Sequence, residues 1–273
     1  MRVQQYFDAT VPTWEDIYRQ RTLYATIYRQ RLWTALRLVD QLGLARPGAA
    51  LDLGCGPGFG TTALARRGFR VCAADSTAQM VELTLARARS AGLHARVSGR
   101  VSDIRALSFP DAQFDLVLVI GVSEWLDSLL GPLAEVARVL KPGGCLVLSA
   151  DNSGALCSLL DPLRHPLVVP IKRALGAARR RLWPRPRPLR TRAYSRRTLD
   201  RALRRAGLTI TDGVTIGFGP FTFCTRGLLP DHLGHALDRQ LQALAQHLPP
   251  LRSAGLVHVV SAVKPALATP LAS

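Results

Sequence analysis

Short apolar runs alternate with amphipathic stretches along most of the chain. The apolar runs have strand length and predict strands at residues 50–54, 70–75, 94–98, 114–120, 145–150, 208–216 and 256–263. Apolar positions at helical spacing predict helices at residues 59–67, 77–91, 126–139 and 196–206, and an amphipathic helix near 231–247. Strands that alternate with helices indicate an α/β fold, here a doubly wound, mostly parallel sheet of seven strands with both faces covered.

The same pattern divides the chain into one large α/β unit with additions, as its 273 residues allow. Residues 1–46 place aromatic side chains at helical spacing and predict an N-terminal helical cap, which precedes a core at 47–150. An insertion at 151–195 contains the proline-rich run 183–188, which predicts an extended linker. Residues 196–273 return to the sheet and carry a second insertion at 217–254. Both insertions are expected to rise above one edge of the sheet as lids.

Positive charge is concentrated in the first insertion and the helix after it. Residues 172–205 contain fourteen Lys or Arg and one acid, which is +13 of the formal net charge of +17. Such a segment suits phosphate, an acidic substrate or an anionic membrane surface. A solvated arginine-rich face explains it equally well, because the whole chain uses Arg in place of Lys and contains only three Lys.

The cysteines and the apolar runs predict a cytoplasmic protein. The five cysteines are odd in number and far apart, and no pair has the spacing of a metal site or a redox motif, so no metal is expected. No apolar run reaches the roughly 18 residues needed to cross a bilayer, and residues 1–8 lack the apolar centre of a signal peptide.

The most informative motif is a glycine-rich turn between the first predicted strand and helix. Residues 54–58 read Gly-Cys-Gly-Pro-Gly, and glycine lets the backbone turn tightly and approach a ligand closely. Asp75 ends the second strand about twenty residues later, the distance at which an acid meets ribose hydroxyls in doubly wound folds. Asp75 as the cap of the following helix is the alternative interpretation.

With these motifs the chain resembles the class I S-adenosylmethionine-dependent methyltransferases, which have a Rossmann-like fold. The glycine spacing is tighter than in the dinucleotide fingerprint, and three further motifs follow in the family's order. They are the acidic loop 102–110, the fourth strand 114–120, and the helix and turn 137–144 that lead into the fifth strand. The resemblance covers residues 45–150 strongly and implies S-adenosylmethionine as cofactor, methyl transfer as activity and a small-molecule acceptor.

The resemblance also implies which residues bind the cofactor. The glycines would face its methionine part, Asp75 its ribose, Met80 and Asp103 its adenine, and residues 120–123 its methyl group. The full implied set is Asp52, Gly54, Cys55, Gly56, Gly58, Asp75, Ser76, Met80, Asp103, Ile104, Ile120 and Val122. Asp52 has two open interpretations, either near the cofactor's amino group or only as an organiser of the glycine loop.

In the resembled family the N-terminal segment closes over the cofactor and forms one wall of the acceptor pocket. Here that implies contacts from Tyr6, Tyr18, Tyr28 and Arg31. An acceptor hydroxyl needs a proton acceptor, whereas an enolate or an activated carbon does not. Glu124, Asp151 and His165 are the candidates, but each has an ordinary structural explanation, so the sequence assigns no catalytic residue.

The acceptor class can be narrowed. Enzymes that methylate the exocyclic amines of bases typically carry a polar-Pro-Pro-aromatic tetrapeptide after the fourth strand, whereas residues 120–125 read Ile-Gly-Val-Ser-Glu-Trp. The apolar and aromatic insertions favour a small hydrophobic acceptor, methylated on oxygen or carbon, and the basic segment favours contact with an anionic membrane. Two alternatives stay open: an RNA methyltransferase that uses residues 172–205, and a cofactor-binding protein without catalysis.

Overall fold

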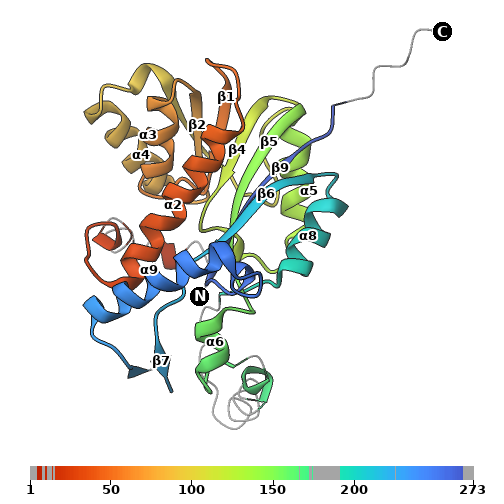
Figure 1. The fold of residues 1–273 in the computed structure, drawn as a ribbon. Coiled ribbons are helices and arrows are strands. Elements are labelled where there is room, and N and C mark those ends of the chain that lie inside the picture. The colour runs from red at the N-terminus through yellow and green to blue at the C-terminus, as the bar shows by residue number, and fades with distance from the viewer. Residues whose placement is uncertain are drawn as a thin grey trace, which may run out of the picture.

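A computed structural model describes residues 5–7, 10, 14, 16–165, 167–171, 174, 191–224 and 226–266. Its centre is a seven-stranded sheet in the order β3-β2-β1-β4-β5-β9-β6 (Figure 1). The strands are β1 (Ala49–Leu53), β2 (Arg70–Asp75), β3 (Val97–Val101), β4 (Phe114–Val119), β5 (Leu140–Asp151), β6 (Thr209–Ile216) and β9 (Val257–Val263). Strand order reverses beside β1, so the switch point of the doubly wound sheet lies at the carboxyl ends of β1 and β4.

Six of the seven strands point the same way, and β9 is the exception. β1 pairs in parallel with β2 and β4, and the same holds for β2 with β3 and for β4 with β5. β9 runs antiparallel to both β5 and β6, so β6 points the same way as the first five strands. The predicted α/β fold with a mostly parallel seven-stranded sheet is confirmed.

Helices cover both faces of the sheet. α2 (Leu23–Gln41) and α3 (Phe59–Arg66) bury apolar side chains with β1, β4 and β9 in one core, and α4 (Ala78–Ser90) packs beside α3 on β2 and β3. α5 (Leu130–Val139) and α8 (Arg196–Arg205) form the second core on the opposite face. The long helix of the N-terminal segment is therefore part of the layer that covers the sheet, in addition to any role at the site.

Three predicted boundaries are wrong. The fifth strand, predicted at 145–150 after a helix and turn, begins at Leu140, because Leu140 already pairs with Phe114 of β4 ahead of a register shift. Residues 94–96 form a 3₁₀ turn, and β3 begins at Val97, where it pairs with Val71. β3 is an edge strand with mostly exposed side chains, so its apolar pattern is too weak to fix its position. The helix predicted to begin at residue 126 begins at Leu130, because the Leu126 N–H is bonded to Ser123 O and the Leu130 N–H to Ser128 Oγ in a turn.

The described parts of the insertions project from the carboxyl edge of the sheet, at the lower end of the molecule in Figure 1. They include α6 (Leu156–Leu160), α9 (Asp231–His247), and a hairpin of β7 (Thr222–Phe223) and β8 (Arg226–Gly227), which the sequence pattern did not predict. The predicted linker at 183–188 lies outside the described residues. Within the described part of the chain, no helix is both long enough and apolar enough to cross a bilayer.

Candidate cofactor and acceptor site

The glycine-rich turn joins β1 to α3 and is tied to the end of β2. The N–H groups of Gly54 and Cys55 both donate to Ala74 O, at 2.7 and 3.1 Å. Gly58 has a φ of +84°, and a Cβ there would lie 2.9 Å from Thr84 Cα, so only glycine fits. Gly54 is equally enclosed, because the Val122 side chain lies where its Cβ would be. The turn therefore brings β1, β2, α4 and the end of β4 together.

Asp75 organises this turn directly. Its carboxylate accepts the Gly56 N–H at 3.1 Å through Oδ2 and the Thr77 N–H at 3.0 Å through Oδ1. Thr84, which sequence reasoning missed, donates to Gly56 O at 2.8 Å from α4. The alternative interpretation of Asp75 as the cap of α4 (Ala78–Ser90) is wrong, because the N-cap is Thr77 and Asp75 only accepts the N–H of that residue. The ribose contact of Asp75 stays a prediction.

Asp52 lies under the turn and is only 3 % exposed. Thr61 Oγ1 donates to its Oδ2 at 2.6 Å, and a Cβ on Gly60 would lie 3.0 Å from the same oxygen. Burial raises the pKa of Asp52 to about 6, although the Thr61 hydrogen bond opposes this. These contacts support the interpretation in which Asp52 organises the start of α3.

The raised pKa of Asp52 predicts a pH effect on stability. Native Asp52 binds a proton at pH values where the unfolded chain has lost it, so this group makes the free energy of unfolding fall as pH rises through about 4 to above 6. Asp52→Asn removes this effect. Relative to the parent, the variant should gain about 1–3 kcal/mol between about pH 4 and pH 8, measured by urea denaturation. The same pH dependence in both proteins would contradict the assignment.

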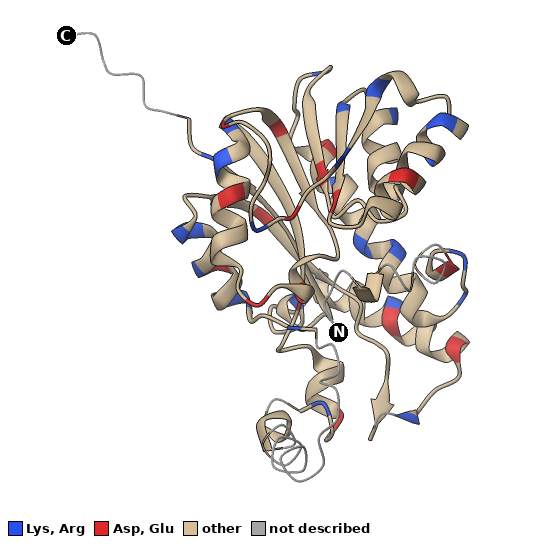
Figure 2. Ribbon diagram, turned by 180° about the vertical axis from the view of Figure 1, so that it is seen from behind, with Lys and Arg blue, Asp and Glu red and all other residues tan. Residues whose placement is uncertain are grey.

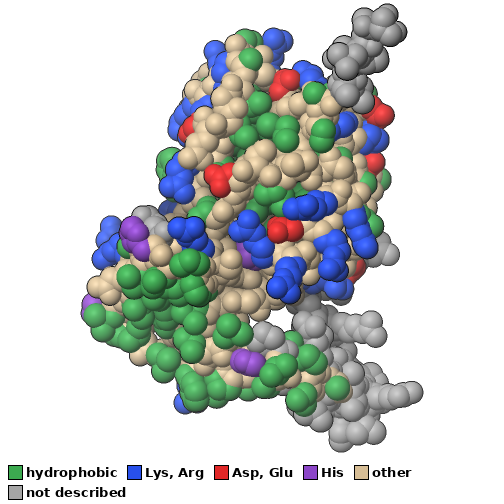
Figure 3. Space-filling model, turned by 45° about the vertical axis from the view of Figure 1, so that its right-hand side comes forward, with side chains coloured by type: hydrophobic (Ala, Val, Ile, Leu, Met, Phe, Trp, Pro, Cys, Tyr) green, Lys and Arg blue, Asp and Glu red, His purple; other side chains and the backbone are tan. Residues whose placement is uncertain are grey.

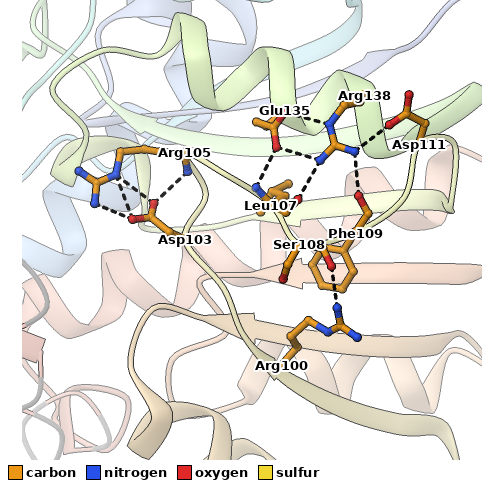
Figure 4. A network of polar contacts seen from close by, with 9 residues as sticks. All are labelled: Arg100, Asp103, Arg105, Leu107, Ser108, Phe109, Asp111, Glu135 and Arg138. Carbon is orange, nitrogen blue, oxygen red and sulfur yellow. Dashed lines mark hydrogen bonds and ion pairs between the residues drawn. The ribbon is translucent and has the colours of Figure 1, made fainter.

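The acidic loop after β3 lies against the end of β2, where the Ser102 N–H donates to Asp75 O at 2.9 Å. Asp103 forms an ion pair with Arg105 at 2.6 Å, and both side chains are substantially exposed (Figure 4). The Arg105 guanidinium lowers the pKa of Asp103 by hydrogen bonding, so the carboxylate stays ionised. Exposed ion pairs are weak, and Asp103 can therefore exchange Arg105 for a ligand donor. Arg105 was missed because nothing in a loop sequence fixes where its side chain folds back.

Arg138 of α5 fixes the rest of this loop (Figure 4). Its guanidinium donates to Leu107 O and Phe109 O and pairs with Glu135 and Asp111. Glu135 Oε2 accepts the Leu107 N–H at 2.8 Å. Met80 of α4 is buried, and Ile104 of the loop is partly buried against the α5 core.

The end of β4 forms the side opposite β2. Ile120 is partly buried against the α2 core, and Val122 covers Gly54. The Ser123 hydroxyl donates to Ser149 O at 2.9 Å, and the Ser149 hydroxyl accepts the Gly121 N–H at 3.0 Å. Both hydrogen bonds are donated by the turn after β4 to Ser149 of β5, and they hold this turn rigidly.

Two of the candidate catalytic residues, Glu124 and Asp151, lie near each other here, and Arg31 of α2 adds a third charged group. Arg31 Nη1 of α2 pairs with Glu124 Oε1 at 2.9 Å, and both side chains are about 95 % buried. Burial is the largest single influence and lowers the pKa of Arg31, but Glu124, Tyr28, Asp151 and Tyr18 together raise it by more, so the guanidinium stays charged. Asp151 at the end of β5 is close enough to feel both groups, and burial followed by the Glu124 charge raises its pKa to about 7. His165 instead accepts the Leu167 N–H within its own turn, at 3.3 Å.

Aromatic rings from the N-terminal segment gather beside this charged cluster. Tyr6, Phe7 and Trp14 pack on Trp125, the residue after Glu124, with ring centroids 5.1 to 6.4 Å apart. Tyr18 packs on Phe59 of α3 at 4.4 Å, and Tyr28 stacks against Arg31. The four N-terminal candidates are thus divided between the glycine turn and the charged cluster.

The polar groups near Asp75 suit a nucleoside. The hydroxyls of Thr77 and Ser102 are buried, and neither has a hydrogen-bond partner among the described residues. Buried polar groups normally have partners, and these two flank the carboxylate predicted to bind ribose. Together with the glycine cradle, this donor and acceptor set fits S-adenosylmethionine.

Comparisons with known proteins identify the domain that carries this site. Residues 51–148 match the methyltransferase domain family. The malonyl-[acyl-carrier protein] O-methyltransferase of Serratia marcescens is 36 % identical over 121 residues, which cover 44 % of this chain and 45 % of that protein. The trans-aconitate 2-methyltransferase of Azoarcus sp. is 34 % identical over 145 residues, or 52 % and 53 % of the two chains. The matched region thus spans about half the length of these relatives.

The fold itself has wider matches. A chain in the complex between the Haloferax volcanii Trm112 methyltransferase activator and a methyltransferase has a TM-score of 0.62 at 19 % identity. The match covers 98 % of this chain and 99 % of that one.

Proposed function

We propose that residues 51–148 are a methyltransferase domain of the class I, S-adenosylmethionine-dependent type, and that the whole chain is a methyltransferase acting on a small hydrophobic acceptor. One observation carries the proposal. Asp75 ties the glycine turn to the end of β2 beside the unpartnered Ser102 hydroxyl, at the switch point where doubly wound folds bind nucleosides.

The cofactor would lie across the ends of β1, β2 and β4. Asp75 and Ser102 would bind its ribose side, Asp103 its adenine amine, and the glycine turn its methionine part. When bound, S-adenosylmethionine supplies an activated methyl group. The protein's task is then to orient the acceptor and exclude water, which rigid strand ends joined by Ser123 and Ser149 support.

The acceptor would enter beside the turn after β4. The aromatic cluster of Tyr6, Phe7, Trp14 and Trp125 offers an apolar wall, which favours a flat hydrophobic molecule. The five free cysteines fit the reducing cytoplasm, where we place the protein.

Two measurements test the proposal. Calorimetry should show binding of S-adenosylmethionine and of its demethylated product, and a host metabolite extract incubated with labelled methyl donor should yield a labelled small molecule. Donor binding without any labelled product would favour the cofactor-binding alternative. Tight, salt-dependent binding of RNA would favour an RNA methyltransferase, which the turn after β4 disfavours because it lacks the polar-Pro-Pro-aromatic tetrapeptide.

We further propose that the insertions rest on an anionic membrane from which a hydrophobic acceptor enters. The exposed large apolar side chains of the insertions are Leu159, Leu160, Leu167, Ile171, Phe223, Leu228, Leu229, Leu233, Leu244 and Leu248, and they gather at the lower end of the molecule in Figure 3. α8 adds five arginines at the side of the molecule (Figure 2). Apolar surface combined with arginines suits an anionic lipid surface.

The membrane proposal predicts a loss of vesicle binding in a double variant. Leu159→Ser with Leu160→Ser should weaken binding to phosphatidylserine vesicles about tenfold, because two partly exposed leucines lose their burial in lipid. Raised salt should weaken it further. Co-sedimentation is the measurement, and Leu130→Ser is the matched control, since Leu130 is 43 % exposed on α5. Sedimentation that neither the double variant nor salt alters would contradict the proposal.

A further inference from the structure

The charges at the ends of β4 and β5 do not balance. Arg31 and Glu124 neutralise one another across 2.9 Å and are buried. Asp151 is the last residue of β5, the strand that pairs directly with β4. It brings a second carboxylate beside the Arg31–Glu124 pair, so these three groups together carry a net negative charge when all are ionised. Arg164 offsets this charge in part, but it acts on Asp151 more weakly than Arg31 does.

The Glu124 carboxylate is paired with Arg31, whereas the Asp151 carboxylate has no such partner among the described residues. Its backbone oxygen accepts the Tyr194 N–H at 2.7 Å, whereas its carboxylate accepts no hydrogen bond from the described residues. The side chain is partly exposed, so a ligand can reach it. The Asp151 main chain pairs with Val257 of β9 and accepts the Tyr194 N–H. These contacts fix the position of the backbone from which the carboxylate extends.

The groups that face Asp151 come from three elements. Glu124 lies after β4, Arg31 and Tyr24 come from α2, and Arg164 follows α6. Burial raises the pKa of Tyr24, and the negative charge of Asp151 adds to this. Tyr24 is also bonded to Tyr28 through their hydroxyls at 2.9 Å. An uncommitted carboxylate thus sits between a closed ion pair and a pair of phenol rings.

We propose that the protein accepts a neutral hydroxyl compound of the phenol or enol class beside Asp151, and that Asp151 is the catalytic residue that removes its proton. The inference rests on the proposed methyltransferase function and names its acceptor class. A carboxylate acceptor is disfavoured, because it would bring a third negative charge beside Asp151 and Glu124. Arg31 is already paired, and Arg164 is the weaker of the two cations that act on Asp151. A neutral hydroxyl adds no charge and donates the hydrogen bond that Asp151 lacks.

The proposed step balances. The acceptor oxygen forms a bond to the methyl carbon, the bond between that carbon and the sulfonium sulfur breaks, and its electron pair stays on sulfur. The hydroxyl proton passes to Asp151. The positive charge of the donor and the negative charge of Asp151 both disappear, so the cluster ends neutral. An Asp151 pKa of about 7 suits a group that takes up and releases a proton near neutral pH.

A pair of matched probes tests the charge preference without knowledge of the natural acceptor. In the presence of S-adenosylhomocysteine at pH 8, binding of 4-methylphenol and of 4-methylbenzoate can be followed by tryptophan fluorescence, since Trp125 adjoins the cluster. The phenol should bind at least about tenfold more tightly than the benzoate, because only the benzoate is repelled. In Asp151→Asn the benzoate should gain about tenfold, so the preference should nearly vanish.

The control is Asp127→Asn, an exposed carboxylate whose side chain is 99 % accessible and which pairs with Arg192 at the surface. It should leave the preference unchanged. A preference for benzoate, an unaltered preference in Asp151→Asn, or binding of neither probe at millimolar concentration would overturn the inference. Calorimetry with S-adenosylmethionine on the same samples separates the two proposals, because failure to bind the donor overturns the function itself.

Once the natural acceptor is identified, turnover gives a second readout. Asp151→Asn should lower kcat by about 10²–10⁴-fold, the usual contribution of a positioned base. The rate of the parent should fall below about pH 7, because Asp151 becomes protonated there, and Asp151→Asn should lack this fall. A methylated product that is a carboxylic ester would refute the assignment of acceptor class.

Discussion

Asp75→Ala should weaken binding of S-adenosylmethionine by about 10²–10³-fold, as measured by calorimetry. The proposed contact consists of two hydrogen bonds from ribose hydroxyls to a carboxylate, each worth about 1.5–3 kcal/mol. The variant also loses the bonds from the N–H groups of Gly56 and Thr77, so the glycine turn loses its tie to β2. Both effects act at the cofactor, and neither removes apolar core.

The fold should survive this change, with a fall in Tm of a few degrees. Asp75→Asn is the matched comparison, because its amide oxygen still accepts one N–H while the charge is lost. It should bind the cofactor between the parent and the alanine variant. Affinity that is unchanged in Asp75→Ala would mean that the ribose lies elsewhere and that Asp75 serves only the turn.

The sequence was sufficient to predict the parts of the fold that depend on local pattern. Buried central strands such as β1 and β4 are continuous apolar runs, and the glycine turn needs glycine for steric reasons that no neighbour can change. Asp75 could be placed because it ends a strand at a fixed distance from that turn. The α/β fold followed from these elements and is confirmed, and residues 51–148 match the methyltransferase domain family.

What could not be predicted depends on distant parts of the chain. Arg31 and Glu124 are 93 residues apart, and a lone arginine in an amphipathic helix is ordinarily solvated. Asp151 became interpretable only when Glu124 was found beside it with its charge already used. The β3 boundary was missed for another reason, since an edge strand with exposed side chains need not carry an apolar pattern.

The second large effect is expected from breaking the buried ion pair. Arg31→Met should destabilise the protein by about 3–5 kcal/mol, because it leaves the Glu124 charge buried without a partner. The methionine fills much of the space of the arginine stem, so lost packing contributes little. Urea denaturation of the parent and the variant gives the difference in free energy of unfolding.

The double variant Arg31→Met with Glu124→Gln separates charge from packing. Replacing both partners removes the unpaired charge, so the double variant should be more stable than Arg31→Met alone by about 2–3 kcal/mol. Equal stability of the two variants would show that the pair is not coupled and that α2 is held to the turn after β4 by its apolar face alone. If the coupling is found, the same contact that stabilises the fold keeps Arg31 from neutralising Asp151. That arrangement leaves Asp151 as the one carboxylate of the cluster able to accept a proton from a ligand.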